Sequence, residues 1–323
     1  MACRLGVKGD RIHGGIDREE PKVTILTGAN RRAEQTISPE EGRIVMHCAD
    51  RPGVVAAVST FLADAGANII ESDQTTTDPD GGPIFLRVVF RVADLAARID
   101  EFREEFAIRV VEPFAVEEWR ITQAAVGKRV AVMVSKYDHC LMELLWRWRR
   151  GELPINIGLV ISNHPDLGPE VRSFGLPFVH IPVTKDTKES AENEQIRLLK
   201  DNFDVVVMAR YMQILSNRFL REVGCPVINI HHSFLPAFIG ASPYLQAHSR
   251  GVKLIGATAH YATEDLDEGP IIEQDVARVN HDDNVAALQR RGADIERAVF
   301  LRAVQWHCED RVLRRGNTTV VFN

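Results

Sequence analysis

The fold of most of this chain is decided by the stretch Val130–Val134, whose sequence is VAVMV. A continuous, β-branched apolar run of this kind is typical of a strand buried on both faces of a parallel sheet. An amphipathic segment follows at residues 140–148, and a second apolar run follows at residues 155–161. Strand, helix and strand in this order predict two parallel strands joined by a helical crossover.

The alternation of predicted strands and helices continues toward the C-terminus. Further elements are predicted as parallel strands at residues 177–181, 205–208 and 227–228, antiparallel strands at 254–261 and 270–276, and helices at 188–200 and about 284–307. Asp282 or Asp283 is predicted to cap the last helix. The fold class predicted for residues 128–323 is therefore α/β, with an open, mostly parallel, doubly wound sheet.

A smaller unit is predicted over residues 43–118. Its strands are predicted at residues 43–48, 68–70, 85–90 and 109–111, with one helix from Val54 and another over 95–106. Asp50 is predicted to cap the first helix and Gly66 to end it. The order βαββαβ predicts a ferredoxin-like sandwich.

This N-terminal unit resembles ACT domains, which are small ligand-sensing modules. The resemblance rests on the turn Asp50–Gly53 after the first strand and on the segment Gly66–Ile69. It implies a homo-oligomer, either a dimer or a tetramer, and an amino-acid effector bound at Pro52, Gly53 and Val54. A ferredoxin-like dimerisation module with no ligand is the alternative.

The segments outside the two units carry little pattern. Residues 1–42 are polar and charged without a sustained period, which predicts a mostly disordered tail. Residues 119–127 are predicted to link the two units. Because no run of about 18 apolar residues occurs, no membrane-spanning helix is predicted.

Net charge and cysteine spacing limit the partners and the cellular compartment that the sequence predicts. The formal net charge is −6, so no net basic field would attract phosphates, and no nucleic-acid partner is expected. The five cysteines have neither CxxC nor zinc-ligand spacing. Reduced thiols in a cytoplasmic protein are therefore predicted.

Two loops carry the residue types of a catalytic site. Asn229 and His231 follow a predicted strand, and open α/β sheets bind ligands beyond the carboxyl ends of their strands. Asp267 lies in a turn that Gly269 and Pro270 end sharply. An amide, an imidazole and a carboxylate suit the transfer of a one-carbon acyl group, since two can stabilise an oxyanion and one can move a proton. A semi-buried structural histidine and a solvated acidic loop are the alternatives.

Residues from about 128 to 320 resemble the formyltransferase fold of folate-dependent formyl-transfer enzymes. The motifs that carry the resemblance are Asn229-x-His231, Ser233-x-Leu235-Pro236 and His260-x6-Asp267-x-Gly269-Pro270. The resemblance implies that Asn229, His231 and Asp267 are the catalytic residues. It also implies that His260 steadies the loop of Asp267, which Gly269 supports.

The same resemblance implies a folate site. Its residues would be Arg210, Tyr211, Met212, Gln213, Ile214 and Leu215, whose backbone holds the pterin, and Thr263, Glu264, Asp265 and Leu266, in the loop that closes over the ring. Ordinary core packing is the alternative for Met212, Ile214 and Leu215, because an apolar pterin slot and a core use the same residue types.

The loop after the first strand of the larger unit separates members of this group. Its sequence is SKYDHCL at residues 135–141, which lacks the glycines of a phosphate-binding loop. No tRNA-binding barrel fits after about residue 310. With an ACT-like unit in front of this domain, the chain resembles the formyltetrahydrofolate deformylases.

This resemblance implies hydrolysis of 10-formyltetrahydrofolate, the folate substrate, to formate and tetrahydrofolate in one-carbon and purine metabolism. Asp267 would activate water, directly or through a second water, while the His231 imidazolium and the Asn229 amide stabilise the oxyanion. No cofactor and no metal are expected. Asp138 and His139 would hold the water or block amine acceptors, although Asp138 suits a helix N-cap equally well. A formyltransferase to a small amine and a non-catalytic folate or amino-acid sensor are the alternatives.

Overall fold

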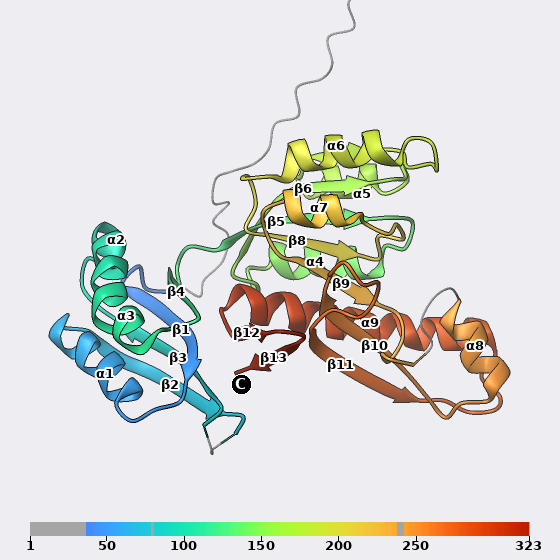
Figure 1. The fold of residues 1–323 in the computed structure, drawn as a ribbon. Coiled ribbons are helices and arrows are strands. Elements are labelled where there is room, and N and C mark those ends of the chain that lie inside the picture. Colours follow the sequence, from blue (N-terminus) through green and yellow to red (C-terminus); the bar gives the residue numbers. More distant parts are fainter. Residues whose placement is uncertain (1–36, 79–80, 238–241, 323) are drawn as a thin grey trace, which may run out of the picture.

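The computed structural model describes residues 37–78, 81–237 and 242–322 of the chain. Figure 1 shows a small N-terminal sheet unit beside a larger α/β unit. The tail predicted over residues 1–42 lies almost wholly outside the described residues. The first strand already begins at Glu41, within the range predicted as tail.

The N-terminal unit is a four-stranded antiparallel sheet of order β2-β3-β1-β4. Its elements are β1 (Glu41–Ala49), α1 (Val54–Asp64), β2 (Asn68–Thr76), β3 (Pro83–Arg91), α2 (Leu95–Phe106), α3 (Glu112–Phe114) and β4 (Glu118–Gln123). Phe102 of α2 stacks on Phe90 of β3 and meets Phe61 of α1 edge to face, with ring centroids 5.1 and 4.7 Å apart. These aromatic contacts hold the helices on one face of the sheet.

The fourth strand of this unit differs from the prediction. Residues 109–111, predicted as a strand, lie in a π-helical turn over Ala107–Val111 that continues α2. The helical backbone keeps Phe106 and Val110 on one face, and both are fully buried. Their burial outweighs the local β propensity of the valines. The edge strand is β4, which pairs with β1 and occupies part of the segment predicted as a linker.

The start of α1 also differs from the prediction. Gly53, and not Asp50, occupies the N-cap position, and no side chain caps the helix there. The φ of Gly53 is 100°, in the left-handed region that glycine adopts without steric cost. Backbone geometry at one glycine therefore starts the helix.

The larger unit is a seven-stranded sheet of order β11-β10-β9-β8-β5-β6-β7. Its strands are β5 (Lys128–Val134), β6 (Ile155–Ser162), β7 (Phe178–His180), β8 (Val205–Ala209), β9 (Val227–His231), β10 (Leu254–Tyr261) and β11 (Ile271–Arg278). Its helices are α4 (His139–Arg149), α5 (Gly168–Ser173), α6 (Lys188–Leu199), α7 (Asn217–Glu222), α8 (Pro243–Arg250) and α9 (Val285–Cys308). A hairpin of β12 (Val312–Arg315) and β13 (Thr318–Val321) follows α9.

Strand pairing confirms the predicted sheet. β5 pairs in parallel with both β6 and β8, and β8 pairs in parallel with β9. β10 and β11 extend the sheet as antiparallel strands. Apolar clusters lie on both faces of the strands, which is why the central strands are continuous apolar runs.

The cap of α9 was predicted one or two residues too early. The side chain of Asn284 accepts a hydrogen bond from the Ala287 N–H at 2.9 Å. Asp283 instead accepts from the Asn280 N–H at 2.8 Å and from Arg291 at 3.1 Å. Its carboxylate is therefore engaged by the turn before the helix and by Arg291 of α9, and the cap falls to Asn284.

The two units share an apolar patch and a buried carboxylate. Val45 and Phe85 of the N-terminal sheet form a core cluster with Leu313 of the C-terminal hairpin. At the end of α9, Asp310 accepts from Arg120 of β4 and contacts Lys128, each at 2.9 Å. Burial acts to raise the pKa of Asp310, but these cations outweigh it and hold the pKa well below its usual range. No helix among the described residues is long and apolar enough to span a membrane.

Candidate active site

The end of β9 and its antiparallel neighbour β10 place three polar side chains together. Asn229 and His231 are two residues apart on β9 and therefore point to the same face of the sheet. The register of β10 puts His260 directly opposite Asn229. The strand pairing therefore brings together Asn229 and His260, which are 31 residues apart in the sequence.

Asp267 enters the site from the loop between β10 and β11. Its Oδ1 lies 3.2 Å from His231 Nδ1 and 3.8 Å from His260 Nε2, and its side chain is only 8% exposed. A Cβ on Gly269 would lie 1.8 Å from the carbonyl oxygen of Tyr261, so only glycine lets the loop pass this close to β10. The loop therefore turns Asp267 inward instead of leaving it in solvent.

The hydrogen bonds of His260 assign its tautomer. Its Nδ1 lies 3.0 Å from the Tyr261 carbonyl oxygen, which can only accept, so Nδ1 carries the proton. Burial lowers the pKa of His260, which favours the neutral ring. Its Nε2 is then an acceptor and receives the amide N–H of Asn229 at 3.2 Å. His260 thus fixes which way the Asn229 amide faces.

The charge state of Asp267 follows from its surroundings. Burial acts to raise the pKa of Asp267, but the hydrogen bond from His231 outweighs it. The pKa of this carboxyl therefore lies below its usual range, and the group is ionised at neutral pH. On the other side of the same ring, His231 Nε2 is buried without a hydrogen-bond partner in the described structure. A substrate oxygen could accept a hydrogen bond there.

A cavity of about 280 Å³ opens beside these residues. It is lined by the predicted catalytic residues, by His260 and by every predicted folate-binding residue, namely Arg210, Tyr211, Met212, Gln213, Ile214, Leu215, Thr263, Glu264, Asp265 and Leu266. Met212, Ile214 and Leu266 are 48%, 59% and 50% exposed. Met212 and Ile214 are therefore not core residues, and their apolar surface faces a space that a flat ring could fill.

Ser135 at the end of β5 holds the 210–212 segment in place. Its backbone N–H donates to the Arg210 carbonyl at 3.3 Å, and its hydroxyl accepts from the Met212 N–H at 2.9 Å. The hydroxyl also donates to the Asn163 side-chain oxygen at 2.6 Å. One serine thereby fixes the backbone of the cavity wall from the neighbouring strand.

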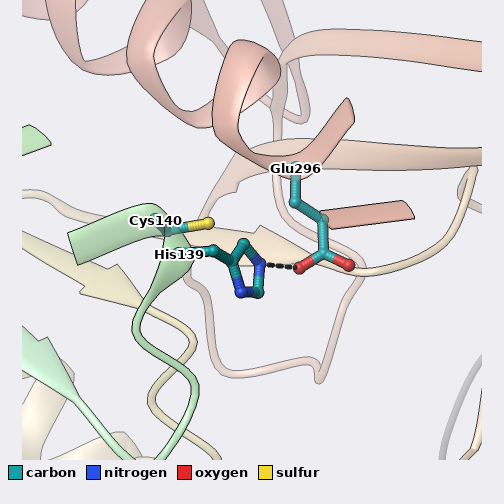
Figure 2. Close-up of side chains that lie close together, drawn as sticks. All are labelled: His139, Cys140 and Glu296. Carbon is teal, nitrogen blue, oxygen red and sulfur yellow. Dashed lines mark hydrogen bonds and ion pairs between the residues drawn. The ribbon is translucent and has the colours of Figure 1, made fainter. Parts of the chain in front are cut away.

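Asp138 and His139, predicted to act near the attacking water, do not line the cavity. Asp138 sits at the N-cap position of α4, but its side chain makes no capping hydrogen bond. His139 is directed toward α9, where its Nε2 lies 2.8 Å from Glu296 Oε2, as Figure 2 shows. The structure thus separates both residues from the predicted catalytic group.

Sequence reasoning missed Glu296, which contacts three side chains and does not line the cavity. Its Oε1 accepts from the Tyr244 hydroxyl at 2.6 Å, and its Oε2 lies 2.8 Å from His139 Nε2 and 3.4 Å from Arg210 Nε. Burial acts to raise the pKa of Glu296, but these partners lower it to about 2. Glu296 lies on the buried stripe of α9 with Gly292 and Val299, and a charged residue on an apolar stripe could have indicated it.

Glu296, His139 and Cys140 also offer three atoms of metal-ligand type within 4.8 Å of one another. Burial raises the pKa of the Cys140 thiol well above its usual value, so the sulfur is a protonated, poor ligand. The Arg210 guanidinium, 3.4 Å from Glu296, adds a positive charge that opposes a bound cation. The group fits an internally satisfied hydrogen-bond cluster better than a metal centre.

Two family models match the chain. The model described as formyl transferase matches residues 128–304, and the model described as ACT domain matches residues 42–107. The first covers the sheet that carries the cavity, and the second covers most of the N-terminal sheet.

Whole-chain relatives carry the same two units. A protein named formyltetrahydrofolate deformylase from Mycobacterium tuberculosis (strain ATCC 25618 / H37Rv) is 59% identical over 281 residues, which cover 87% of this chain and 90% of that protein. The crystal structure of a formyltetrahydrofolate deformylase from Pseudomonas syringae pv. tomato str. DC3000 has a TM-score of 0.84 at 49% identity, covering 88% of this chain and 94% of that one.

A more distant solved structure matches the larger unit alone. It is glycinamide ribonucleotide transformylase 1 from Symbiobacterium toebii, with a TM-score of 0.57 at 30% identity, covering 61% of this chain and 95% of that one. The same sheet architecture therefore occurs in proteins named deformylase and in proteins named transformylase.

Proposed function

The chain belongs to the formyltetrahydrofolate deformylases, and from this premise we propose that Asn229, His231 and Asp267 carry out its hydrolysis of 10-formyltetrahydrofolate. The single observation that supports this assignment most is geometric. Asp267 contacts Nδ1 of His231, whose Nε2 is left without a partner beside a cavity with apolar lining. The protein is a hydrolase, and its products are formate and tetrahydrofolate.

The reaction begins when water attacks the formyl carbon. Asp267, ionised because of its low pKa, takes a proton from the water directly or through a second water. A carbon–oxygen bond forms, and the formyl oxygen becomes an oxyanion. His231, through its unpartnered Nε2, and the Asn229 amide donate hydrogen bonds to that oxyanion.

The tetrahedral intermediate then collapses. The bond from carbon to N10 breaks, and N10 receives the proton that Asp267 holds. Formic acid loses its remaining acidic proton to solvent as formate. The addition of water and the expulsion of N10 change no oxidation state, and every proton released is taken up, so the proposal needs no redox partner.

The cavity lining supports the way in which the folate would be held. Residues 210–215 line the cavity, and Ser135 fixes the backbone of Arg210 and Met212, so backbone polar groups of this segment would bind a pterin edge. The loop Thr263–Leu266 lies across the same cavity and would cover the other face of the ring.

For the N-terminal unit we propose an effector site and a pairing surface. The turn at Pro52, Gly53 and Val54 would bind an amino acid, and the exposed, left-handed Gly53 leaves its backbone accessible. Strand β2 is an exposed sheet edge with Ile70 50% exposed, which suits pairing of copies into a dimer or tetramer. Buried free thiols at Cys48, Cys140 and Cys308 suit a reducing, cytoplasmic compartment.

Formate release from 10-formyltetrahydrofolate by the purified chain, with and without an added amine, tests the function. We expect equal amounts of formate and tetrahydrofolate without any acceptor, abolished in Asp267→Asn. Formate-free turnover that appears only with an amine would mean a formyltransferase. Folate binding without turnover under either condition would mean a sensor and would overturn the proposal.

A further inference from the structure

Arg210 has a backbone conformation that an arginine rarely adopts. It follows β8 directly, and its φ of 63° lies in the left-handed region that favours glycine. Its side chain is only 5% exposed. A strained, buried cation at the wall of a catalytic cavity is retained only where its surroundings over-determine it, and such residues cluster at functional sites.

The surroundings of Arg210 do hold it firmly. Its carbonyl accepts from Ser135, its guanidinium carbon lies 4.8 Å from the Tyr137 ring centroid, and its Nε lies 3.4 Å from Glu296. Neither Nε nor Nη1 makes a hydrogen bond to any described residue. The side chain is therefore positioned by stacking and charge, while part of its donor capacity stays unused.

Glu296 is itself locked in place. Tyr244 and His139 bind its two oxygens, and a Cβ on Gly292 would lie 1.8 Å from the Tyr244 hydroxyl oxygen. The absence of a side chain at Gly292 is what lets Tyr244 reach Glu296. Three elements, α4, α8 and α9, thus converge on the carboxylate that faces Arg210.

The position of this group relative to the cavity suggests its role. Arg210 and His232 both line the cavity, whereas Glu296, His139 and Tyr244 do not. Glu296 contacts Arg210, and the Tyr244 ring lies 5.9 Å from that of His232. The guanidinium carbon of Arg210 lies 4.8 Å from the ring centroid of Tyr137, so the side chain is turned toward the loop after β5, whose lack of phosphate-binding glycines sets this chain apart from the transferases.

We propose that Arg210, held by Glu296, closes the acceptor side of the formyl site, so that water reaches the formyl carbon and an amine does not. This inference rests on the proposed function. It makes Arg210 a specificity-determining residue and Glu296 its positioning residue. The fold alone does not select the acceptor, because the Symbiobacterium toebii transformylase shares the sheet.

Both competing reactions balance without any further reactant. In hydrolysis, water forms the new carbon–oxygen bond, the carbon–N10 bond breaks, and a proton from water passes to N10. In transfer, a primary amine forms a carbon–nitrogen bond, the same carbon–N10 bond breaks, and an amine proton passes to N10. The two routes need different nucleophiles beside the formyl carbon, and the amine is the larger of the two.

The test measures how the formyl group is partitioned between water and glycinamide as the glycinamide concentration is raised. Tetrahydrofolate release gives the total turnover, and formate and N-formylglycinamide give the partition. Arg210→Gly removes the side chain and suits the left-handed backbone. We expect its share of N-formylglycinamide to rise on the order of tenfold or more over the wild type, since excluding a few atoms sterically gives discrimination of about that size.

Asp201→Gly is the matched control. Asp201 also has a left-handed backbone, with φ of 62°, but it is exposed and does not line the cavity. Its partition should equal that of the wild type. An equal rise in both variants would overturn the proposal, because general loosening of the fold would then explain the result.

Glu296→Gln provides a second, independent variant of nearly unchanged volume. It keeps Arg210 but removes the charge that holds it, so we expect a smaller rise in N-formylglycinamide than in Arg210→Gly. If Arg210→Gly does not fold, an unchanged partition in Glu296→Gln overturns the proposal. Formate as the sole product of a folded Arg210→Gly at saturating glycinamide also overturns it. A wild type that releases no tetrahydrofolate would instead refute the function itself.

Discussion

Two buried carboxylates, Asp267 and Glu296, differ in how their oxygens are engaged and in whether they border the cavity. Asp267 is paired on one oxygen with His231 and borders the cavity. Glu296 has both oxygens occupied by Tyr244 and His139, faces Arg210, and does not line the cavity. A low pKa alone therefore does not mark a catalytic group, and unused acceptor capacity beside a cavity is what separates the two.

The largest effect is expected for Asp267, the carboxylate that borders the cavity. Asp267→Asn removes the proton acceptor, so we expect kcat to fall by about 10²–10⁴ while folate binding persists. Steady-state turnover and equilibrium binding of tetrahydrofolate would measure the two effects. Glu268→Gln in the same loop is the control, because Glu268 is exposed and does not line the cavity, and it should keep wild-type turnover. Comparable losses in both variants would contradict a special role for Asp267.

The next largest effect tests whether the Asn229 amide stabilises the oxyanion. Asn229→Ala removes one donor, and turnover should fall by about 10²–10³ with little change in folate binding. His260→Ala should lower turnover less, because His260 orients the Asn229 amide and lies beside Asp267 without donating to the oxyanion itself. A loss in His260→Ala that exceeds the loss in Asn229→Ala would place His260, and not Asn229, at the reacting atoms.

On the Glu296 side we expect a stability effect that depends on pH. The pKa of Glu296 is about 2 in the folded protein and near its ordinary value of 4.5 in the unfolded chain. The ionised carboxylate therefore stabilises the fold fully above about pH 4.5 and loses this contribution as pH falls toward 2. Urea unfolding over this range should show a shallower pH dependence in Glu296→Gln than in the wild type. Identical slopes would contradict the low pKa.

Two substitutions in the Glu296 cluster compare, at neutral pH, how much a charge and a hydrogen bond contribute to the free energy of unfolding. Removing one partner of a buried ion pair costs about 3–5 kcal/mol, so Glu296→Gln should lower the free energy of unfolding by up to that amount. Tyr244→Phe removes only one hydrogen bond to Glu296 and should cost about 1–3 kcal/mol. Urea denaturation at pH 7 would measure both. A larger loss in Tyr244→Phe would mean that packing, and not charge, dominates this cluster.

Local sequence patterns predicted most helices and strands, but they misplaced one edge strand and two helix caps. The strand at Val130–Val134 and the helix over Leu95–Phe106 were recognisable because their periodicity is a local property. The strand predicted at residues 109–111 was wrong, because Val110 is buried by neighbours from elsewhere in the chain. Likewise, Asn284 caps α9 because Asp283 is already bound by Arg291.

The sequence by itself determined that an amide, imidazoles and a carboxylate would stand at the carboxyl edge of a parallel sheet. Strand periodicity, the Asn229-x-His231 spacing and Gly269 are all local features. Only the tertiary structure decided the tautomer of His260, the direction of His139 and the contact between Arg210 and Glu296. Those depend on side chains from separate elements meeting in space, and a buried polar group takes its partner from whatever the packing brings within hydrogen-bond reach.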